Sequence, residues 1–170
     1  PFKRPISVLS FASNIFFTGL EPFPFKLTNL AIHLCNGLLI YFISKTLITV
    51  INPKINSYFF ALLTCTFFLI HPITLSSVLY IVQRMTSLSA LFSLLGILLY
   101  IKGRVSPPTN KSYTLIFLSL FICTALAVLS KENGLLLPYF LLLIEFVFFS
   151  FNSPSKKLSA TLRYGSMLLI

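Results

Sequence analysis

Five long apolar runs, separated by short polar segments, constrain this sequence more than any other feature. The runs cover about residues 27–50, 58–70, 86–101, 113–129 and 135–151, and a sixth begins near Leu162. A membrane-spanning helix needs about 20 mostly apolar residues, so the shorter runs must recruit flanking residues to cross a bilayer. Only 9% of the 170 residues are charged, against roughly a quarter in a soluble domain. The sequence therefore predicts an all-α polytopic membrane helix bundle of about five to six spans, and it excludes soluble enzymes and disulfide-rich secreted domains.

Residues 1–26 differ from the rest, because polar residues recur there at steps of three or four. The polar residues that recur at this spacing are Ser7, Ser10, Asn14 and Thr18. This spacing predicts a helix with a narrow polar stripe over Pro5–Thr18, with Pro5 suited to the first turn. Since it is short for a span and basic at its start, we expect it to lie at the membrane interface or to re-enter the membrane. We divide the chain into this amphipathic segment, 1–26, and a transmembrane part, 27–170, of a single membrane domain.

Both ends of the sequence and its cysteines add two further expectations. The chain starts at Pro1 without an initiator Met and stops at Ile170 inside an apolar run, so we expect it to be part of a larger polytopic protein.

Cys35, Cys65 and Cys123 each lie singly inside an apolar run, where a thiol behaves as a small hydrophobic group. We find no metal-ligand spacing and no phosphate-binding glycine loop. We expect no metal site among these residues and no cofactor, and a requirement for a divalent metal stays open.

The formal net charge of +10 comes from basic residues placed singly or in pairs between apolar runs. This distribution is typical of membrane loops, so the expected partner is membrane lipid and no nucleic acid is expected. The loops after the first, third and fifth spans are the richest in basic residues: Lys45, Lys54, Lys102, Arg104, Lys111, Lys156, Lys157 and Arg163. The positive-inside rule places these loops in the cytoplasm. Residues 1–26, the loop 71–84 and the loop 130–134 are then expected on the outer face.

The expected outer face also holds the polar residues that loop solvation explains least well. The candidates for binding a donor phosphate or another part of a substrate are Arg84, Lys131, Gln83, His71, Arg4 and Glu132. Arg84 is the strongest candidate, because a guanidinium at the mouth of a span can hold a phosphate through paired hydrogen bonds. Lys131 and Glu132 either contribute to such a site or pair with one another or with neighbours. His71 is either a ligand or proton carrier, or a structural residue that caps a span.

Other polar residues are expected to have structural roles or to lie in the wrong place. His33 shares one helical face with Asn29 and Asn36, which predicts hydrogen bonds to another helix. Glu145 falls near the opposite end of its span, and Glu21 lies in the turn after the first helix. The sequence therefore supplies cations for an outward-facing site, but no well-placed carboxylate.

Several motifs, in order along nearly the whole chain, resemble those of the GT-C membrane glycosyltransferases. The first group runs from Phe2-Lys3-Arg4-Pro5 through Ser10-Phe11, Asn14, Gly19-Leu20, Leu27-Thr28-Asn29-Leu30 and His33 to Asn36-Gly37. The second comprises His71-Pro72, Ser77-Val78, Tyr80-Ile81, Gln83-Arg84, Leu129-Ser130-Lys131-Glu132 and Pro138. They are similar to signatures of bacterial protein-mannosyltransferase-like enzymes and of transmembrane-and-TPR-containing O-mannosyltransferases.

The resemblance implies a glycosyltransferase that moves a sugar from a polyprenyl-phosphate carrier to a protein or glycan acceptor on the outer face. It implies that the catalytic Asp precedes Pro1, and that Arg84 and Lys131 meet the donor phosphate. Ser76 stands where the family usually has an acid. The implied membrane is the bacterial inner membrane, or that of the endoplasmic reticulum in a eukaryote.

Two other classes of function remain open at this point. A transporter or flippase for lipid-linked sugars would also be polytopic and basic, but spans broken by Gly or Pro in two related halves are expected there, and we see no such pairing. A non-catalytic scaffold subunit is compatible with Ser76 and with the small number of acids. An Asp in the preceding outer loop would separate the transferase from the scaffold.

Overall fold

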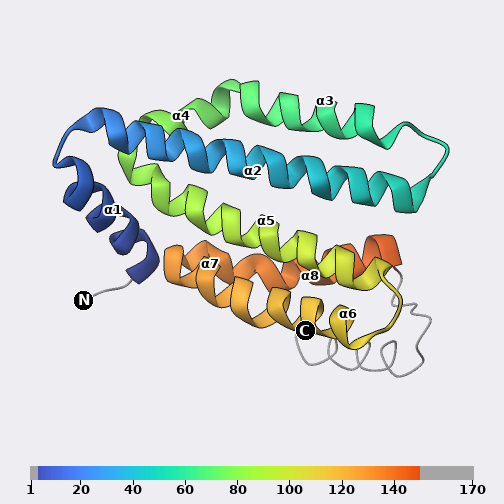
Figure 1. Ribbon diagram of the computed structural model, residues 1–170. Coiled ribbons are helices and arrows are strands. Elements are labelled where there is room, and N and C mark those ends of the chain that lie inside the picture. Colours follow the sequence, from blue (N-terminus) through green and yellow to red (C-terminus); the bar gives the residue numbers. More distant parts are fainter. Residues whose placement is uncertain (1–3, 150–170) are drawn as a thin grey trace.

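The computed structural model describes residues 4–149, and they form an all-α bundle (Figure 1). The α-helices are α1 (Pro5–Thr18), α2 (Pro22–Ile51), α3 (Ser57–Ile70), α4 (Leu75–Leu79), α5 (Arg84–Val105), α6 (Asn110–Phe117), α7 (Thr124–Ser130) and α8 (Leu137–Ile144). Short 3-10 segments are η1 (Pro72–Thr74), η2 (Ile81–Gln83) and η4 (Glu132–Leu136), and π-helical segments are η3 (Leu118–Cys123) and η5 (Glu145–Phe149). The expected sixth span near Leu162 lies outside the described residues.

Four continuous helical stretches are long and apolar enough to cross a membrane. They are Pro22–Ile51, Ile81–Val105, Asn110–Ser130 and Glu132–Phe149, and the bent pair of Ser57–Ile70 with Pro72–Leu79 gives a fifth. Each coincides with one of the five apolar runs of the sequence, so the prediction of an all-α membrane bundle is confirmed. At 1.5 Å per residue the 30 residues of α2 extend about 45 Å, longer than the hydrocarbon core of a bilayer.

The fifth candidate span bends by 53° between Ile70 and Pro72. Pro72 has no N–H for the helix ladder, and its ring forces the preceding residue out of the helical conformation. His71 is accordingly extended, with φ −60° and ψ 128°, and its Nδ1 accepts a hydrogen bond from the Ile73 N–H at 3.2 Å. The His-Pro pair therefore ends α3 and starts the short helices that lead to α5.

The central helix of the bundle is α5. It packs against α2 on one side and against α6, α7 and α8 on the other, while α3 lies on the far side of α2 (Figure 1). Its small residues allow close approach: Ser119 donates a hydrogen bond to the Gly96 carbonyl at 2.7 Å. The apolar core is small and comprises Tyr100, Ile116, Cys123, Leu137 and Leu141.

Polar side chains are buried between the helices, whereas large apolar side chains cover the outside. Asn29, His33 and Asn36 are buried on one face of α2, and His33 Nε2 lies 3.3 Å from the Leu69 carbonyl of α3. The prediction that these residues bond to neighbouring helices is confirmed: Asn29 Nδ2 donates to the Tyr80 carbonyl at 3.2 Å, and Asn36 donates to the Ser87 carbonyl at the same distance. Buried polar groups with an apolar exterior are what a lipid solvent requires.

The bundle has two ends, which we name by their buried arginines. At the Arg84 end, α1 and the starts of α2 and α5 meet the end of α7 and the start of η4 (Figure 1). At the Arg104 end, the C-terminal part of α5 meets α6 and η5. The candidate residues of the sequence are distributed around the Arg84 end, apart from His71.

Candidate functional site

The polar stripe of α1 docks onto the bundle at the Arg84 end. Ser7 is buried and donates to the Ser130 carbonyl at the end of α7, at 2.8 Å. Asn14 Nδ2 donates to Thr28 Oγ1 of α2 at 3.1 Å. The helix predicted over Pro5–Thr18 is present with the same bounds, and its stripe is satisfied mainly by neighbouring helices. This docking holds α1 against the starts of α2 and α5.

Arg84 is fully buried where these three helices meet. Its Nε donates to Asn29 Oδ1 at 2.8 Å, and one terminal nitrogen donates to the Phe25 carbonyl at 2.9 Å. The other terminal nitrogen donates to Asn14 Oδ1 at 2.6 Å and to the Ser10 carbonyl at 3.2 Å. The guanidinium carbon also lies 4.7 Å from the centroid of the Phe11 ring and 5.3 Å from that of Phe25.

This enclosure bears on the expectation that Arg84 holds a donor phosphate. All three guanidinium nitrogens are engaged by α1 and α2, and no part of the side chain is exposed. A phosphate could reach the guanidinium only if α1 moved away. The geometry favours a role for Arg84 in joining α1 and α2 to the start of α5, with cation–π contacts adding to its hydrogen bonds.

Lys131 and Gln83 meet through Thr86 on the first turn of α5. Lys131 Nζ donates to Thr86 Oγ1 at 2.7 Å, and the same hydroxyl donates to Gln83 Oε1 at 3.1 Å. Lys131 is partly buried and Gln83 is exposed. Lys131 forms no ion pair among residues 4–149, so the ammonium keeps donors available for an incoming anion. Of the candidate cations Arg4, Arg84 and Lys131, Lys131 is the one whose charged group remains able to bind an anion.

A groove of about 410 Å³ begins at Thr86 and runs along α5. Its polar lining lies mainly on one face of α5 and on η4: Thr86, Ser89, Ser93 and Asn133. Its apolar lining comes from α2, α3, α5 and the last span: Ile40, Phe68, Ala90, Leu94, Ile97, Leu136 and Phe140. From Thr86 to Ser93 the groove extends about 10 Å along the helix axis. Lys131 therefore places a positive charge beside one end of a mostly apolar groove.

Arg4 and Glu132 form an ion pair near this end of the bundle. One guanidinium nitrogen lies 2.7 Å from Glu132 Oε2, and the side chains are 34% and 61% exposed. Arg4 Nε also donates to Oε1 of the same carboxylate at 3.2 Å. The expectation that Lys131 and Glu132 bind each other or their neighbours is resolved: each binds a different neighbour. Since Glu132 is held by Arg4, the pair serves to attach the start of α1 to η4.

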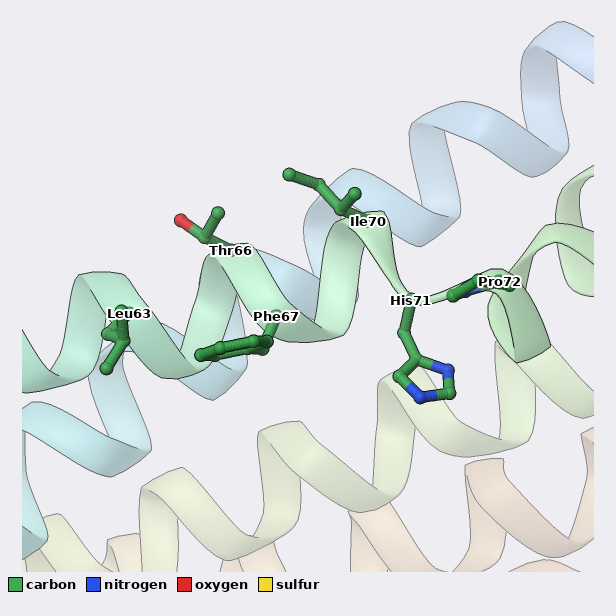
Figure 2. Close-up of a pocket in the computed structure, with 6 residues that line it drawn as sticks. All are labelled: Leu63, Thr66, Phe67, Ile70, His71 and Pro72. Atoms are coloured by element: carbon green, nitrogen blue, oxygen red, sulfur yellow. The ribbon is translucent and has the colours of Figure 1, made fainter.

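His71 and Ser76 lie apart from this group. Figure 2 shows His71 at the bend after α3, next to an apolar hollow of about 350 Å³ lined also by Leu63, Thr66, Phe67, Ile70 and Pro72. The imidazole is exposed and its Nδ1 caps the turn, as the structural alternative predicts. Ser76 donates to the Ile73 carbonyl at 3.1 Å. Neither side chain shares a hydrogen bond with Arg84 or Lys131.

The sequence reasoning missed a buried charge cluster at the Arg104 end. Arg104 was counted as a loop cation, but it lies inside α5 and is buried against Glu145 of the last span. Tyr100 donates to Glu145 Oε2 at 2.8 Å. The spacing of Tyr100 and Arg104, one helical turn apart, could have shown that both side chains face the same neighbour. Within the described chain, no group of three or more His, Cys, Asp or Glu could hold a metal ion.

Comparison with known proteins gives relatives of one kind. The chain is 36% identical over 140 residues to protein O-mannosyl-transferase TMTC1 of Mus musculus and 37% identical over 139 residues to TMTC1 of Homo sapiens. It is 30% identical over 147 residues to Tmtc3 of Drosophila melanogaster. Each match covers 78% of this chain, which spans only 14%, 15% and 16% of those three proteins. No family model matches the sequence, and no solved structure matches it significantly.

Proposed function

Because the chain is homologous to the protein O-mannosyl-transferases over most of its length, we propose that it is part of a membrane glycosyltransferase. The full protein would transfer a mannosyl group to a hydroxyl of a protein acceptor. Its donor would be a sugar linked to a polyprenyl phosphate. The integral membrane character of the chain agrees with a donor of this kind, since the donor is itself a membrane lipid.

One structural observation supports a lipid-linked donor most directly: Lys131 stands beside the end of an apolar groove. A polyprenyl phosphate has an anionic head and a long apolar tail. The tail would lie along the apolar side chains of the groove, and the phosphate would meet the ammonium of Lys131. Thr86 and Gln83 extend this site as a chain of hydrogen bonds from the ammonium to an exposed amide.

The chemistry assigns different tasks to this chain and to the rest of the protein. When the glycosidic bond to the phosphate breaks, negative charge builds on the departing phosphate, and a positioned cation lowers the barrier. The acceptor hydroxyl must lose a proton to a carboxylate within hydrogen-bond reach. Glu132 is bound to Arg4, and Glu145 lies at the opposite end of the bundle. We expect the base to come from sequence ahead of Pro1, as the family resemblance implies.

The side of the membrane and the kind of membrane are also part of the proposal. The distribution of basic residues favours placing the Arg84 end outside the cytoplasm. The relatives reported above are animal proteins, which favours the endoplasmic reticulum over a bacterial inner membrane. The enzyme would then meet its acceptor protein in the lumen of the endoplasmic reticulum.

Transfer of labelled mannose tests this function. Membranes that contain the full-length protein should move the label from a polyprenyl-phosphate mannose to Ser or Thr of an acceptor protein. Membranes from cells that lack the protein are the control. If the full-length protein uses a nucleotide sugar directly, or moves no sugar while remaining folded, the proposal is wrong.

A further inference from the structure

Arg84 carries a buried positive charge that no carboxylate among residues 4–149 neutralises. The chain has three acidic residues, of which Glu132 binds Arg4 and Glu145 binds Arg104. The third, Glu21, is exposed and forms no ion pair within residues 4–149. The described partners of Arg84 are all neutral: two amide oxygens, two carbonyls, a hydroxyl and two aromatic rings. A charge buried inside a protein is costly, and an anion that comes close reduces this cost.

A shallow, open hollow of about 390 Å³ lies beside this charge, between α1 and α2; four of its five lining residues have polar side chains, although most of its accessible surface is apolar. It is lined by Ser10, Ser13, Asn14, Phe17 and Thr28. Two of these residues, Ser10 and Asn14, accept hydrogen bonds from the same guanidinium nitrogen of Arg84. A ligand in the hollow would therefore be separated from the charge by one layer of side chains.

The Ser10 hydroxyl gives the hollow a donor. Ser10 Oγ accepts from Arg84 at 3.4 Å, and its own hydrogen has no acceptor among the described residues. The other two hydroxyls of the lining are engaged internally, since Ser13 donates to the Leu9 carbonyl at 2.9 Å and Thr28 to the Pro24 carbonyl at 3.0 Å. A hydroxyl that accepts from a guanidinium is polarised and is a stronger donor to an anionic oxygen.

We propose that this hollow binds the phosphate of a membrane phospholipid, with Ser10 donating to a phosphate oxygen and Arg84 supplying the compensating charge. The surroundings fit a lipid: Phe16, Phe17 and Leu20, at the end of α1 and just beyond it, are large apolar side chains that are largely exposed. Acyl chains would cover this surface while the headgroup sits in the hollow. The hollow shares no lining residue with the groove beside Lys131. The lipid would fix α1 to the bundle and is separate from the sugar donor.

Native mass spectrometry of the delipidated full-length protein tests this site, with phosphatidylglycerol, diacylglycerol and a polyprenyl phosphate as probes. Phosphatidylglycerol should bind, and diacylglycerol, which lacks the phosphate, should not displace it. Ser10→Ala should weaken phosphatidylglycerol binding about tenfold, the loss of one hydrogen bond to a charged group. Thr18→Val removes a hydroxyl of the same helix that does not line the hollow and that donates to the Asn14 carbonyl at 2.8 Å, so this variant should bind as the wild type does.

Three results would overturn the inference. Equal binding by the Ser10→Ala and Thr18→Val variants would show that the Ser10 hydroxyl touches no phosphate. Equal competition by diacylglycerol would show that the apolar surface alone binds the lipid. If the polyprenyl phosphate bound to the protein and phosphatidylglycerol did not, the hollow would belong to the sugar donor. This experiment measures lipid binding and not mannosyl transfer. The proposed function can therefore fail while the lipid site is confirmed.

Discussion

Arg104 and Glu145 form an ion pair inside the bundle that joins α5 to the last described span. A terminal nitrogen of Arg104 lies 2.6 Å from Glu145 Oε1, and Arg104 Nε lies 2.8 Å from Oε2. Both side chains are 1% exposed, and Tyr100 adds a hydrogen bond to the same carboxylate. Because the two helices cannot slide past one another without breaking this fork, the pair fixes their register.

Neutralising one member of the pair should destabilise the protein strongly. Glu145→Gln leaves the Arg104 charge without its carboxylate, which costs about 3–5 kcal/mol at a buried site. Unfolding of the purified protein by increasing SDS measures the loss. The double variant Arg104→Met with Glu145→Leu removes both charges, and it should lose much less stability than Arg104→Met and Glu145→Leu, measured singly, lose in sum. An additive double variant would show that the residues do not act as a pair.

The helices of this fold could be predicted because their signal is the length of apolar runs. All five predicted spans coincide with helical stretches. The ends differ by several residues, since the helices extend into flanks that contain prolines or charged residues, such as Pro22–Lys26 and Lys102–Val105. The bend at His71-Pro72 can be predicted from the sequence because proline lacks a backbone N–H and disfavours the helical conformation of the residue before it. What hydropathy could not show is which side chains of different helices meet, because that depends on rotation and packing.

The candidate site could be predicted less well than the helices, because it depends on which side chains of different helices meet. The sequence ranks Arg84 above Lys131 as a phosphate ligand, yet Arg84 is enclosed by α1 and α2 and Lys131 stands beside a groove. Arg84 is enclosed because α1 folds back onto α2 and α5. This tertiary contact joins residues that are far apart in the sequence, such as Asn14 and Arg84, which are 70 positions apart. Arg104 was assigned to a loop because a positive charge near a span end usually contacts water.

Replacing Arg84 should lower the amount of folded protein. In Arg84→Met, the oxygens of Asn29, Asn14 and Phe25 lose their donor, and each buried unsatisfied group costs about 1–3 kcal/mol. Arg84→Lys should be intermediate, since one ammonium cannot reach partners on both α1 and α2. Arg4→Met is the matched control, because it breaks an exposed pair that contributes about 0–1 kcal/mol. Fluorescence-detected size exclusion of solubilised membranes measures the folded fraction, and equal profiles for the three variants would contradict the structural role of Arg84.

Lys131 should affect transfer more than folding. If its ammonium meets the departing phosphate, Lys131→Met should reduce kcat about 100-fold, the effect of removing one positioned donor in a transition state. Lys131→Arg should retain part of the rate because the charge remains. Lys111→Met, an exposed lysine at the Arg104 end, is the control and should transfer at the normal rate. Rates are measured per folded molecule, and a normal rate in Lys131→Met would place the donor phosphate elsewhere.

The orientation of the bundle can be tested with single cysteines. In sealed microsomes, a cysteine at Asn110 should react with an impermeant maleimide, because the Arg104 end is expected to face the cytoplasm. A cysteine at Asn133, at the Arg84 end, should react only after the membrane is permeabilised. Both positions are exposed, so accessibility of the side chain itself does not limit either reaction. The reverse pattern would place the proposed donor site on the wrong side of the membrane.

Gly134 should be the least replaceable glycine of the described chain. A Cβ at this position would overlap the backbone of Ala127 and Val128, which cannot yield unless η4 separates from α7. At Gly19 a Cβ meets open space, and the cost comes from the backbone, whose φ of 68° with ψ −149° is a conformation adopted essentially only by glycine, about 1–3 kcal/mol. Gly134→Ala should therefore abolish folding or displace Lys131 from Thr86, whereas Gly19→Ala should give a mildly destabilised protein with normal transfer. Folded yield and transfer rate, measured together for both variants, check this order; similar yields would show that η4 and α7 do not pack as closely as their backbones indicate.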